Sequence, residues 1–215
     1  MTYLELVNNV LRRIREEEVP SVSSTTYSKM IGDFVNDAKK IVEAAWDWSA
    51  LRTTLTIQTT DDIFNYVLVG SQDRIKALDV INDTSNCFMT YQTSRWFDNQ
   101  YMNQEPVKGS PKNYTYNGVD SNGDTQIDVY PKPDKEYIIR FNCVFRNQDL
   151  EADTDKLFIP HMAVIHWAVS LAARERGETG GTSTPEYIAI AKQYLSDAIA
   201  LDAQKHPYET DWYTP

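Results

Sequence analysis

Residues 30–46 read MIGDFVNDAKKIVEAAW, and this stretch has the clearest periodicity in the chain. Its apolar residues recur every three or four positions, which is the spacing of one face of an α-helix. The pattern extends back to Tyr27, after a run of serines and threonines that can cap a helix, and predicts a helix over residues 27–46. The side chains of this helix that we expect to face a helical core include Phe34, Ile41 and Trp46.

Three more segments have helical patterns. Residues 2–15 form an amphipathic stretch that ends before Val19-Pro20-Ser21. Residues 161–173 follow a proline and are apolar on nearly all sides, which predicts a helix buried among other helices. Residues 185–201 return to the i, i+3, i+4 spacing, and we expect Leu195 and Ile199 to face the same core.

Between residues 52 and 146 the apolar period changes from helical to alternating. Short β-type runs are separated by turn clusters, and residues 95–102 resemble a short helix or loop. The runs are LTIQT, FNYVLV, IKALDVI, CFMTYQT, NYTYN, TQIDVY and YIIRFNCVF. They predict a compact antiparallel sheet or small sandwich.

The expected fold is therefore α+β: a four-helix bundle formed by the N- and C-terminal helices, with an inserted small antiparallel β lobe. We expect the bundle to contain residues 1–50 and 159–203 and the β lobe residues 51–158. Residues 204–215 have no apolar period and two prolines, which predicts an extended C-terminal tail.

Composition excludes several classes of protein. The 215 residues carry 21 Lys and Arg against 31 Asp and Glu, a formal net charge of −10, and the basic residues are scattered. Such a charge disfavours a protein that grips nucleic acid or an anionic membrane by its own positive surface. No stretch of about 20 apolar residues is present to span a membrane. The two cysteines cannot form a disulfide framework, and we expect synthesis in a reducing cytoplasm.

The search for catalytic or ligand-binding motifs finds little. His161 and His166 are five residues apart, which places them on different sides of a helix, and no zinc, nucleotide or nucleophile-elbow motif occurs. The loop of residues 120–124 resembles a calcium loop but lacks the required Gly and Glu, so a tight turn is favoured. We expect no catalytic residues, no cofactor and no metal, although a pair of carboxylates for glycan hydrolysis remains possible.

Two segments are candidates for protein contacts. A dense charge block has two interpretations, a solvated helix face and part of a subunit contact; it consists of Arg12, Arg13, Arg15, Glu16, Glu17 and Glu18. The tail has three aromatic residues with no periodic stripe to join, Tyr208, Trp212 and Tyr213. Exposed aromatic residues at a chain end are typical of partner binding, and the alternative is that they fold back on the protein's own surface.

Both helical ends resemble the head-to-tail adaptor (connector) proteins of tailed bacteriophages. The resemblance rests on the opening TYLELVNNVLRRI, on FVNDAKKIVEAAWDWSAL at residues 34–51 with its Trp-Asp-Trp ending, and on LFIPHMAVIHWAVSLAA at residues 157–173. It covers about half of the chain, and the β region matches by arrangement only.

The resemblance implies a structural virion protein at the neck of the particle, made in the host cytoplasm. It implies a homo-oligomeric ring, usually of twelve copies, that joins the portal protein to a tail nozzle or a further neck protein. DNA would pass through the ring during ejection without being read, and the C-terminal segment, here residues 204–215, would reach the portal. The alternative that we keep is a peptidoglycan hydrolase or a carbohydrate-binding tail accessory protein.

Overall fold

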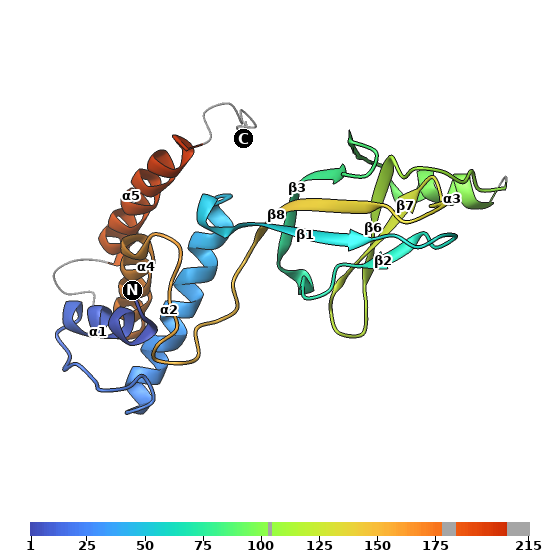
Figure 1. Ribbon diagram of the computed structural model, residues 1–215. Helices are drawn as coiled ribbons and strands as arrows, with labels where there is room; N and C mark the ends of the chain where they lie inside the picture. Colours follow the sequence, from blue (N-terminus) through green and yellow to red (C-terminus); the bar gives the residue numbers. More distant parts are fainter. Residues whose placement is uncertain (103–104, 178–183, 206–215) are drawn as a thin grey trace. The chain divides into compact units, whose positions relative to one another are not determined.

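The computed structural model describes residues 1–102, 105–177 and 184–205. The chain divides into two compact units, which are described separately (Figure 1). The helical unit consists of Met1–Leu51 and the chain from Gln148 onward, and the β unit consists of Arg52–Asn147.

The helical unit contains four α-helices and one short 3-10 turn among its described residues. These elements are α1 (Tyr3–Arg13), α2 (Thr26–Ala45), η1 (Ser49–Leu51), α4 (His161–Glu175) and α5 (Thr184–Ala203). Both N-terminal helices begin with a capping box: Thr2 with Glu5 at α1, and Thr25 with Ser28 at α2. In each box the side chain of the first residue accepts from the backbone amide of the residue three positions later. The side chain of that later residue accepts in turn from the backbone amide of the first, and the pair of bonds defines where the helix starts.

Helix α4 is the centre of this unit. It contacts α1, α2 and α5, and most of its side chains between Ala163 and Ala173 are buried. Figure 1 shows α4 between α5 and α2. Helix α5 packs mainly along α4, and of the side chains described in α5 only those of Ala191 and Asp202 are buried.

An irregular segment, residues 148–160, joins α1 to α2. The side-chain amide of Asn36 donates to the carbonyl of Leu150 at 3.1 Å, and the Leu150 amide donates to Asn36 Oδ1 at 2.9 Å. The amide of Val22 donates to Asp153 Oδ1 at 3.0 Å, and the amide of Tyr3 donates to the carbonyl of Asp155 at 2.8 Å. We call this segment the strap; its polar groups are satisfied by the helices that it holds.

The described part of the β unit contains two four-stranded sheets, a helix, α3 (Ser94–Met102), and a short 3-10 turn, η2 (Gln72–Arg74). The first sheet has the order β1 (Arg52–Gln58), β8 (Ile138–Phe145), β3 (Ile75–Asn82), β4 (Cys87–Phe88). The second has the order β2 (Asn65–Val67), β7 (Thr125–Tyr130), β6 (Asn113–Val119), β5 (Thr90–Tyr91). All pairs are antiparallel except β5 with β6, which is parallel.

The core of the β unit has contributions from both sheets. Val80, Ile139 and Phe141 come from the first sheet, and Ile127 and Val129 come from the second. Leu68 and Met89, which lie outside the strands, complete this buried cluster. The two sheets therefore pack face to face, as alternating strands that each bury one face require.

The expected fold needs a correction. The mixed α+β class is confirmed, but the prediction of a four-helix bundle with a small β lobe is wrong. Helix α5 does not close a bundle, because it lies along α4 and leaves most of its circumference to solvent. The β part is not a small lobe, because it contains two four-stranded sheets. The run CFMTYQT divides into β4 and β5, which belong to different sheets.

The predicted core stripe of α2 is also wrong. Ile31, Val35, Ala38 and Val42 are fully buried, whereas Ile41 is 39% exposed and Phe34 and Trp46 are only partly buried. Leu195 and Ile199 on α5 are partly buried as well. Helix α2 has apolar residues on two adjacent stripes, and the helical period alone does not say which of them meets α4.

Gly32 provides a test of how α1 packs on α2. A Cβ placed there would lie 2.3 Å from the hydroxyl of Tyr3 and 3.0 Å from Cγ1 of Val22. Gly32→Ala should therefore destabilise the protein by about 1–3 kcal/mol from overpacking, despite the roughly 1 kcal/mol that alanine contributes in a helix. Urea unfolding gives the measurement. In a Tyr3→Phe background the same substitution should cost less, and an unchanged cost would contradict this packing.

Candidate interaction surfaces

The Trp-Asp-Trp segment at the end of α2 forms a compact polar and aromatic site. Trp48 is 1% exposed, and its indole nitrogen donates to the carbonyl of Val42 at 2.7 Å, which caps the end of the helix. Trp46 turns the other way, toward α5, and donates to Asp202 Oδ2 at 3.3 Å. The two tryptophans thus have different roles, one in the core and one in joining helices.

Asp202 is the acceptor at the centre of this site and is 6% exposed. Besides the Trp46 indole, its carboxylate accepts the Ser49 amide at 2.8 Å and the Ser49 hydroxyl at 2.5 Å. Lys205 Nζ lies 2.9 Å from Oδ1. We call this arrangement the Asp202 node; it fixes the C-terminal end of α5 against the turn that follows α2.

The electrostatics of the node favour the charged carboxylate. Burial by itself would raise the pKa of Asp202, but the hydrogen bonds from the Ser49 hydroxyl and amide and the charge of Lys205 outweigh it. The net effect is a pKa below the ordinary value for aspartate. A carboxylate that accepts several donors keeps its charge to lower pH, because protonation would remove acceptor capacity.

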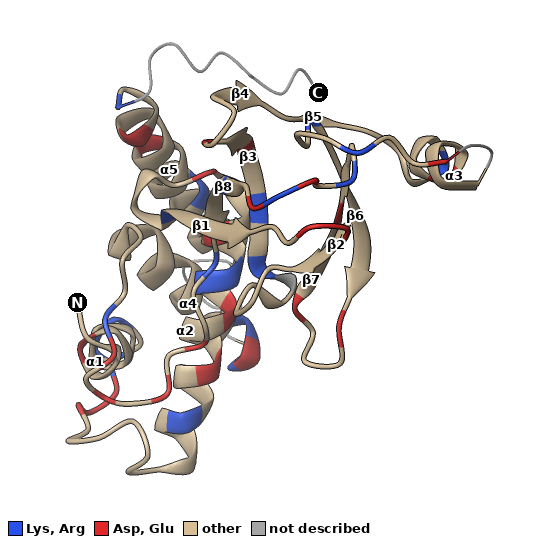
Figure 2. Cartoon of the chain, turned by 45° about the vertical axis from the view of Figure 1, so that its right-hand side comes forward, with Lys and Arg blue, Asp and Glu red and all other residues tan. Residues whose placement is uncertain are grey.

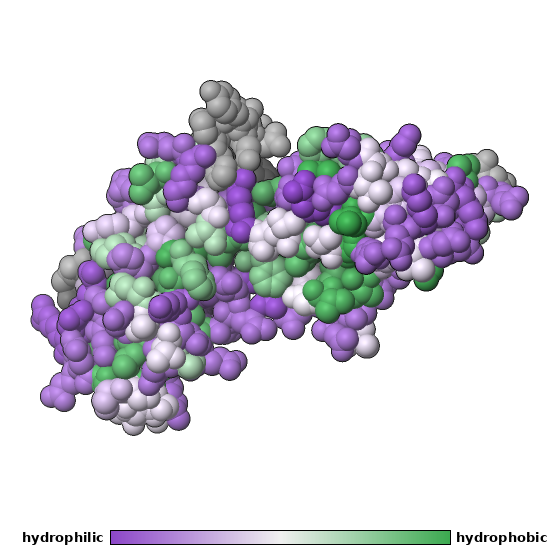
Figure 3. Space-filling view, in the orientation of Figure 1, coloured by the Kyte–Doolittle hydropathy of each residue, from purple (hydrophilic) through white to green (hydrophobic). Residues whose placement is uncertain are grey.

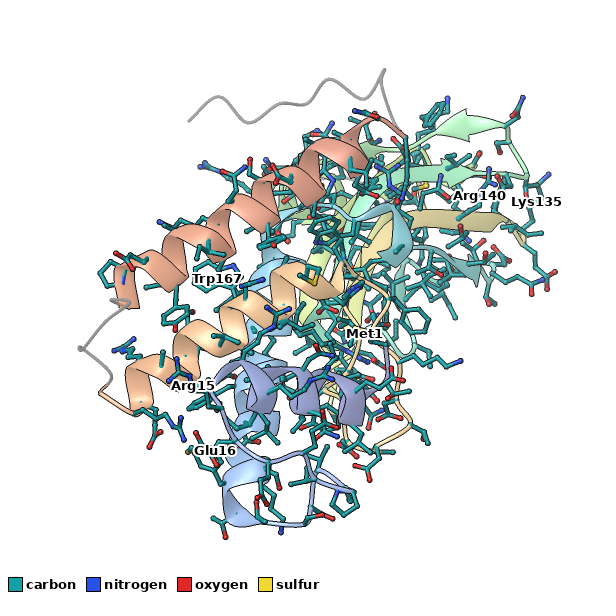
Figure 4. The ribbon with its side chains drawn as sticks, turned by 90° about the vertical axis from the view of Figure 1, so that its left-hand side faces the viewer. Met1, Arg15, Glu16, Lys135, Arg140 and Trp167 are labelled. Atoms are coloured by element: carbon teal, nitrogen blue, oxygen red, sulfur yellow. The ribbon has the colours of Figure 1, made fainter. Side chains whose placement is uncertain are left out.

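The charge block lies at the end of α1 and in the loop after it (Figure 4). All six of its residues are exposed. Two of its carboxylates have partners within the chain: Glu18 pairs with Arg12 at 3.2 Å, and Glu16 pairs with Arg176 at the end of α4. Arg176 also donates to the carbonyl of Ile14 at 2.8 Å. Part of the block therefore joins α1 to α4, and Arg13, Arg15 and Glu17 remain as surface charges.

Charges of both signs lie along the same elements, as Figure 2 shows on α2. One pair is fully buried in α2, where Lys39 Nζ lies 3.2 Å from Glu43 Oε1 and the side chains are 1% and 2% exposed. Basic residues in the described parts are interspersed with acidic ones rather than gathered in a stripe of the kind that binds a nucleic-acid backbone.

The acidic turn that resembles a calcium loop uses its carboxylates on backbone amides. Asp120 Oδ1 accepts from the amides of Asn122 and Asp124, each at 2.8 Å. The two carboxylate oxygens of Asp124 accept from the amides of Gly70 and Gln72, which lowers the pKa of Asp124. Among the described residues, no group of three or more His, Cys, Asp or Glu could hold a metal ion.

The two histidines of α4 lie in different surroundings. His161 is exposed, and the ring of His166 stacks on Tyr194 of α5 with the centroids 4.3 Å apart. Burial, with the charge of Arg13 as a second cause, lowers the pKa of His166. This histidine therefore packs α4 against α5.

A groove of about 480 Å³ runs along the outer side of α1, and Figure 4 shows Met1 at one end of this helix. Its lining includes two carboxylates, Glu5 and Glu18. Glu5 accepts the Thr2 amide in the capping box and Glu18 pairs with Arg12, so each has a structural role.

Helix α5 has several large apolar side chains that are exposed. Ile190 is 41% exposed, Tyr194 37% and Leu201 67%. On the face of the molecule drawn in Figure 3, apolar residues are interspersed with hydrophilic ones. The tail residues Tyr208, Trp212 and Tyr213 lie outside the described residues.

The family model described as SU10 adaptor protein matches residues 1–213. The chain belongs to the SU10 adaptor protein family. This match confirms the resemblance to phage adaptors, and it covers the β unit as well as both helical ends. No protein in the curated set matches the chain.

Members of this family are structural proteins of the bacteriophage virion and contact other head or tail proteins. In the part of the chain that is described, no helix is long and apolar enough to cross a membrane.

Sequence reasoning missed the Asp202 node and the exposed stripe of α5. Asp202 is a single carboxylate at the end of an amphipathic pattern, and nothing local indicates that Ser49, about 150 residues earlier in the chain, donates to it. The exposed stripe could have been found, because Ile190, Tyr194 and Leu201 form a second apolar row beside the row of Leu195 and Ile199.

The two tryptophans should respond differently to truncation. Trp48→Ala removes a fully buried indole and should destabilise the protein by about 3–5 kcal/mol. Trp46→Ala should cost clearly less, because Trp46 is partly exposed and its hydrogen bond is long. Chemical denaturation of both variants decides the point, and equal costs would refute the separate roles.

The Asp202 node should make stability depend on pH. Because the pKa of Asp202 is lowered in the folded protein, its contribution is present above the unfolded-state pKa of about 4 and is lost as the pH falls through the folded value. Asp202→Asn should cost about 1–3 kcal/mol near pH 7, and this cost should shrink as the pH falls below about 4. Asp197→Asn, an exposed carboxylate one turn earlier, is the matched control and should show neither effect.

Proposed function

We propose that this SU10 adaptor chain is the subunit of a head-to-tail adaptor ring that joins the portal to the tail and forms part of the DNA channel. The family match over residues 1–213 carries the proposal. The ring is homo-oligomeric, with twelve copies as the expected number. One side contacts the portal protein, and the other contacts a tail nozzle or a further neck protein.

The charge of the chain suits a passage for DNA. A net charge of −10 repels phosphates over most of the surface, and the described basic residues are interspersed with acidic ones. A duplex next to such a wall slides more readily than it sticks, because few counterions are released by contact.

The tail is the proposed attachment to the portal. Tyr208, Trp212 and Tyr213 follow directly on α5, whose end the Asp202 node holds in place. A firmly anchored helix end restricts where a following segment can reach, which reduces the entropy lost when that segment binds. The exposed arginines of the charge block, Arg13 and Arg15, are proposed to contribute to the contact between subunits.

The solution mass of the chain, alone and with the portal of the same phage, tests this function. Full-length protein should form a ring on the portal, seen by native mass spectrometry or electron microscopy. A variant that lacks residues 208–215 should keep its circular dichroism spectrum and lose stable attachment. If the full chain stays monomeric beside the portal, the ring function is refuted. If the truncated chain attaches with full affinity, only the role of the tail is refuted.

A further inference from the structure

The hairpin of β6 and β7 contains two Asn-Gly dipeptides. Asn117-Gly118 lies within β6, and Asn122-Gly123 lies in the turn that leads to β7. An asparagine that precedes glycine is prone to lose its side-chain amide, because glycine has no side chain to keep other groups away from its backbone nitrogen. The two dipeptides are chemically identical, so a difference in their reactivity must come from the fold.

This loss of the amide, deamidation, needs an asparagine side chain that can move. The backbone nitrogen of the glycine attacks Cγ of the asparagine, a C–N bond forms, and the side-chain nitrogen leaves as ammonia with the proton that the glycine gives up. Water then opens the resulting cyclic imide, either at Cγ, which gives aspartate, or at the backbone carbonyl, which gives isoaspartate. A side chain held in a hydrogen bond cannot bring Cγ to the backbone nitrogen until that bond breaks.

Asn117 is held in this way. Its side-chain nitrogen donates to Asp128 Oδ2 at 3.0 Å, and Asp128 is itself 8% exposed and accepts from the side chain of Asn65 at 2.6 Å. A buried carboxylate that loses a donor is left with an unmet charge, which makes this bond costly to break. The dipeptide is also flanked by residues of β6 that pair with β7.

Asn122 is restrained much less. Its side-chain nitrogen lies 3.4 Å from Asp120 Oδ2, which is long for a hydrogen bond. A Cβ placed on Gly123 would have nothing within 4 Å, so the space beside this glycine is open. The Gly123 amide donates to the carbonyl of Asp120 at 3.1 Å. Because Ser121 and Asn122 are exposed, opening that bond uncovers little buried surface.

We propose that Asn122 is a site of spontaneous deamidation in the folded protein and that the bond to Asp128 protects Asn117. The chain then changes with age into forms that have aspartate or isoaspartate at position 122, and water is the sole co-reactant. The inference goes beyond the proposed ring function and does not depend on it, because it concerns the covalent structure of a single chain.

The modification puts a new charge into a turn that is already acidic. Asp120 Oδ1 accepts the amides of Asn122 and Asp124, each at 2.8 Å. A carboxylate at position 122 replaces the amide beside Asp120 Oδ2, so a weak attraction becomes a repulsion. Isoaspartate also adds a backbone carbon between the two amides that Asp120 binds, and this should disturb both bonds.

The turn is coupled to the loop before β3. The carboxylate of Asp124 accepts the amides of Gly70 and Gln72 at 3.0 and 2.9 Å. Ser71 Oγ accepts the amide of Thr125 at 2.8 Å. Gln72 has a φ of 43°, a conformation that a residue other than glycine keeps when its surroundings hold it there. A displaced Asp124 should therefore loosen this loop.

Ageing of the folded full chain at mildly alkaline pH tests the proposal. One tryptic peptide, residues 113–135, contains both asparagines, and mass spectrometry with fragmentation that separates isoaspartate from aspartate locates each product. Asn122 should convert at least about tenfold faster than Asn117, because a hydrogen bond to a charged group slows Asn117 by a factor of this order. The control is the same protein aged in urea, where both side chains are free and should convert at similar rates.

Two variants separate the effects on the loop. Asn122→Gln is the matched control for the reaction, because its longer side chain closes a less favourable ring. Asn122→Asp supplies the charge without lengthening the backbone. Hydrogen exchange of the Gly70 and Gln72 amides should become faster in the aged wild-type protein and stay unchanged in aged Asn122→Gln, and Asn122→Asp should lie between them.

Each outcome decides the proposal. Selective conversion of Asn122 in the folded protein, with similar rates at both sites in urea, supports it. Equal rates in the folded protein, or a folded chain in which Asn122 does not react although it converts in urea, overturn it. The same preference for Asn122 in urea overturns the protection of Asn117 by the fold. Unchanged hydrogen exchange after ageing overturns the coupling to the loop and leaves the modification site standing.

Discussion

The helical unit depends on the burial of α4. This helix is apolar on nearly all sides, so it is stable in water only when other elements surround it. Helices α1 and α2 cover one part of it, α5 covers another, and the strap ties α1 to α2 through its bonds to Tyr3 and Asn36. Because α4 takes up the centre, α2 and α5 lie on its outside, and each keeps exposed apolar side chains, such as Ile41 on α2 and Leu201 on α5. The packing of one helix therefore decides which surfaces the subunit offers to partners.

A similar constraint shapes the β unit. Strand β7 is buried on both faces: Ile127 and Val129 point into the cluster between the sheets, and Asp128 and Tyr130 point the other way. Helix α3 contacts that second face, where the rings of Trp96, Phe97 and Tyr101 surround Tyr130. Tyr101 also donates to the carbonyl of Val129 at 2.8 Å. Burying both faces of β7 requires three layers, which is more than a small lobe contains.

The sequence predicts well where the helices and strands lie along the chain, but it predicts poorly which of them pack or pair with one another. The helices predicted over residues 27–46 and 161–173 agree with α2 and α4 to within two residues at each end, because their periodicity is local. The split of CFMTYQT was not predictable, because Thr90 pairs with Asn113 in one sheet while Phe88 pairs with Ile81 in the other. The core stripe of α2 was misplaced for the same reason: the choice between Ile41 and Val42 depends on where α4 lies. The Asp202 node likewise joins residues that only the fold brings together.

The exposed apolar side chains of α2 and α5 make physical sense only together with the acidic charge. A monomer gains nothing from leaving Leu201 67% exposed, and exposed apolar side chains on surface helices carry a risk of uncontrolled association. A net charge of −10 opposes that association, because every encounter between copies brings together two negative proteins. Under the proposed ring function, assembly then requires an additional attraction, such as a portal that holds several copies at high local concentration.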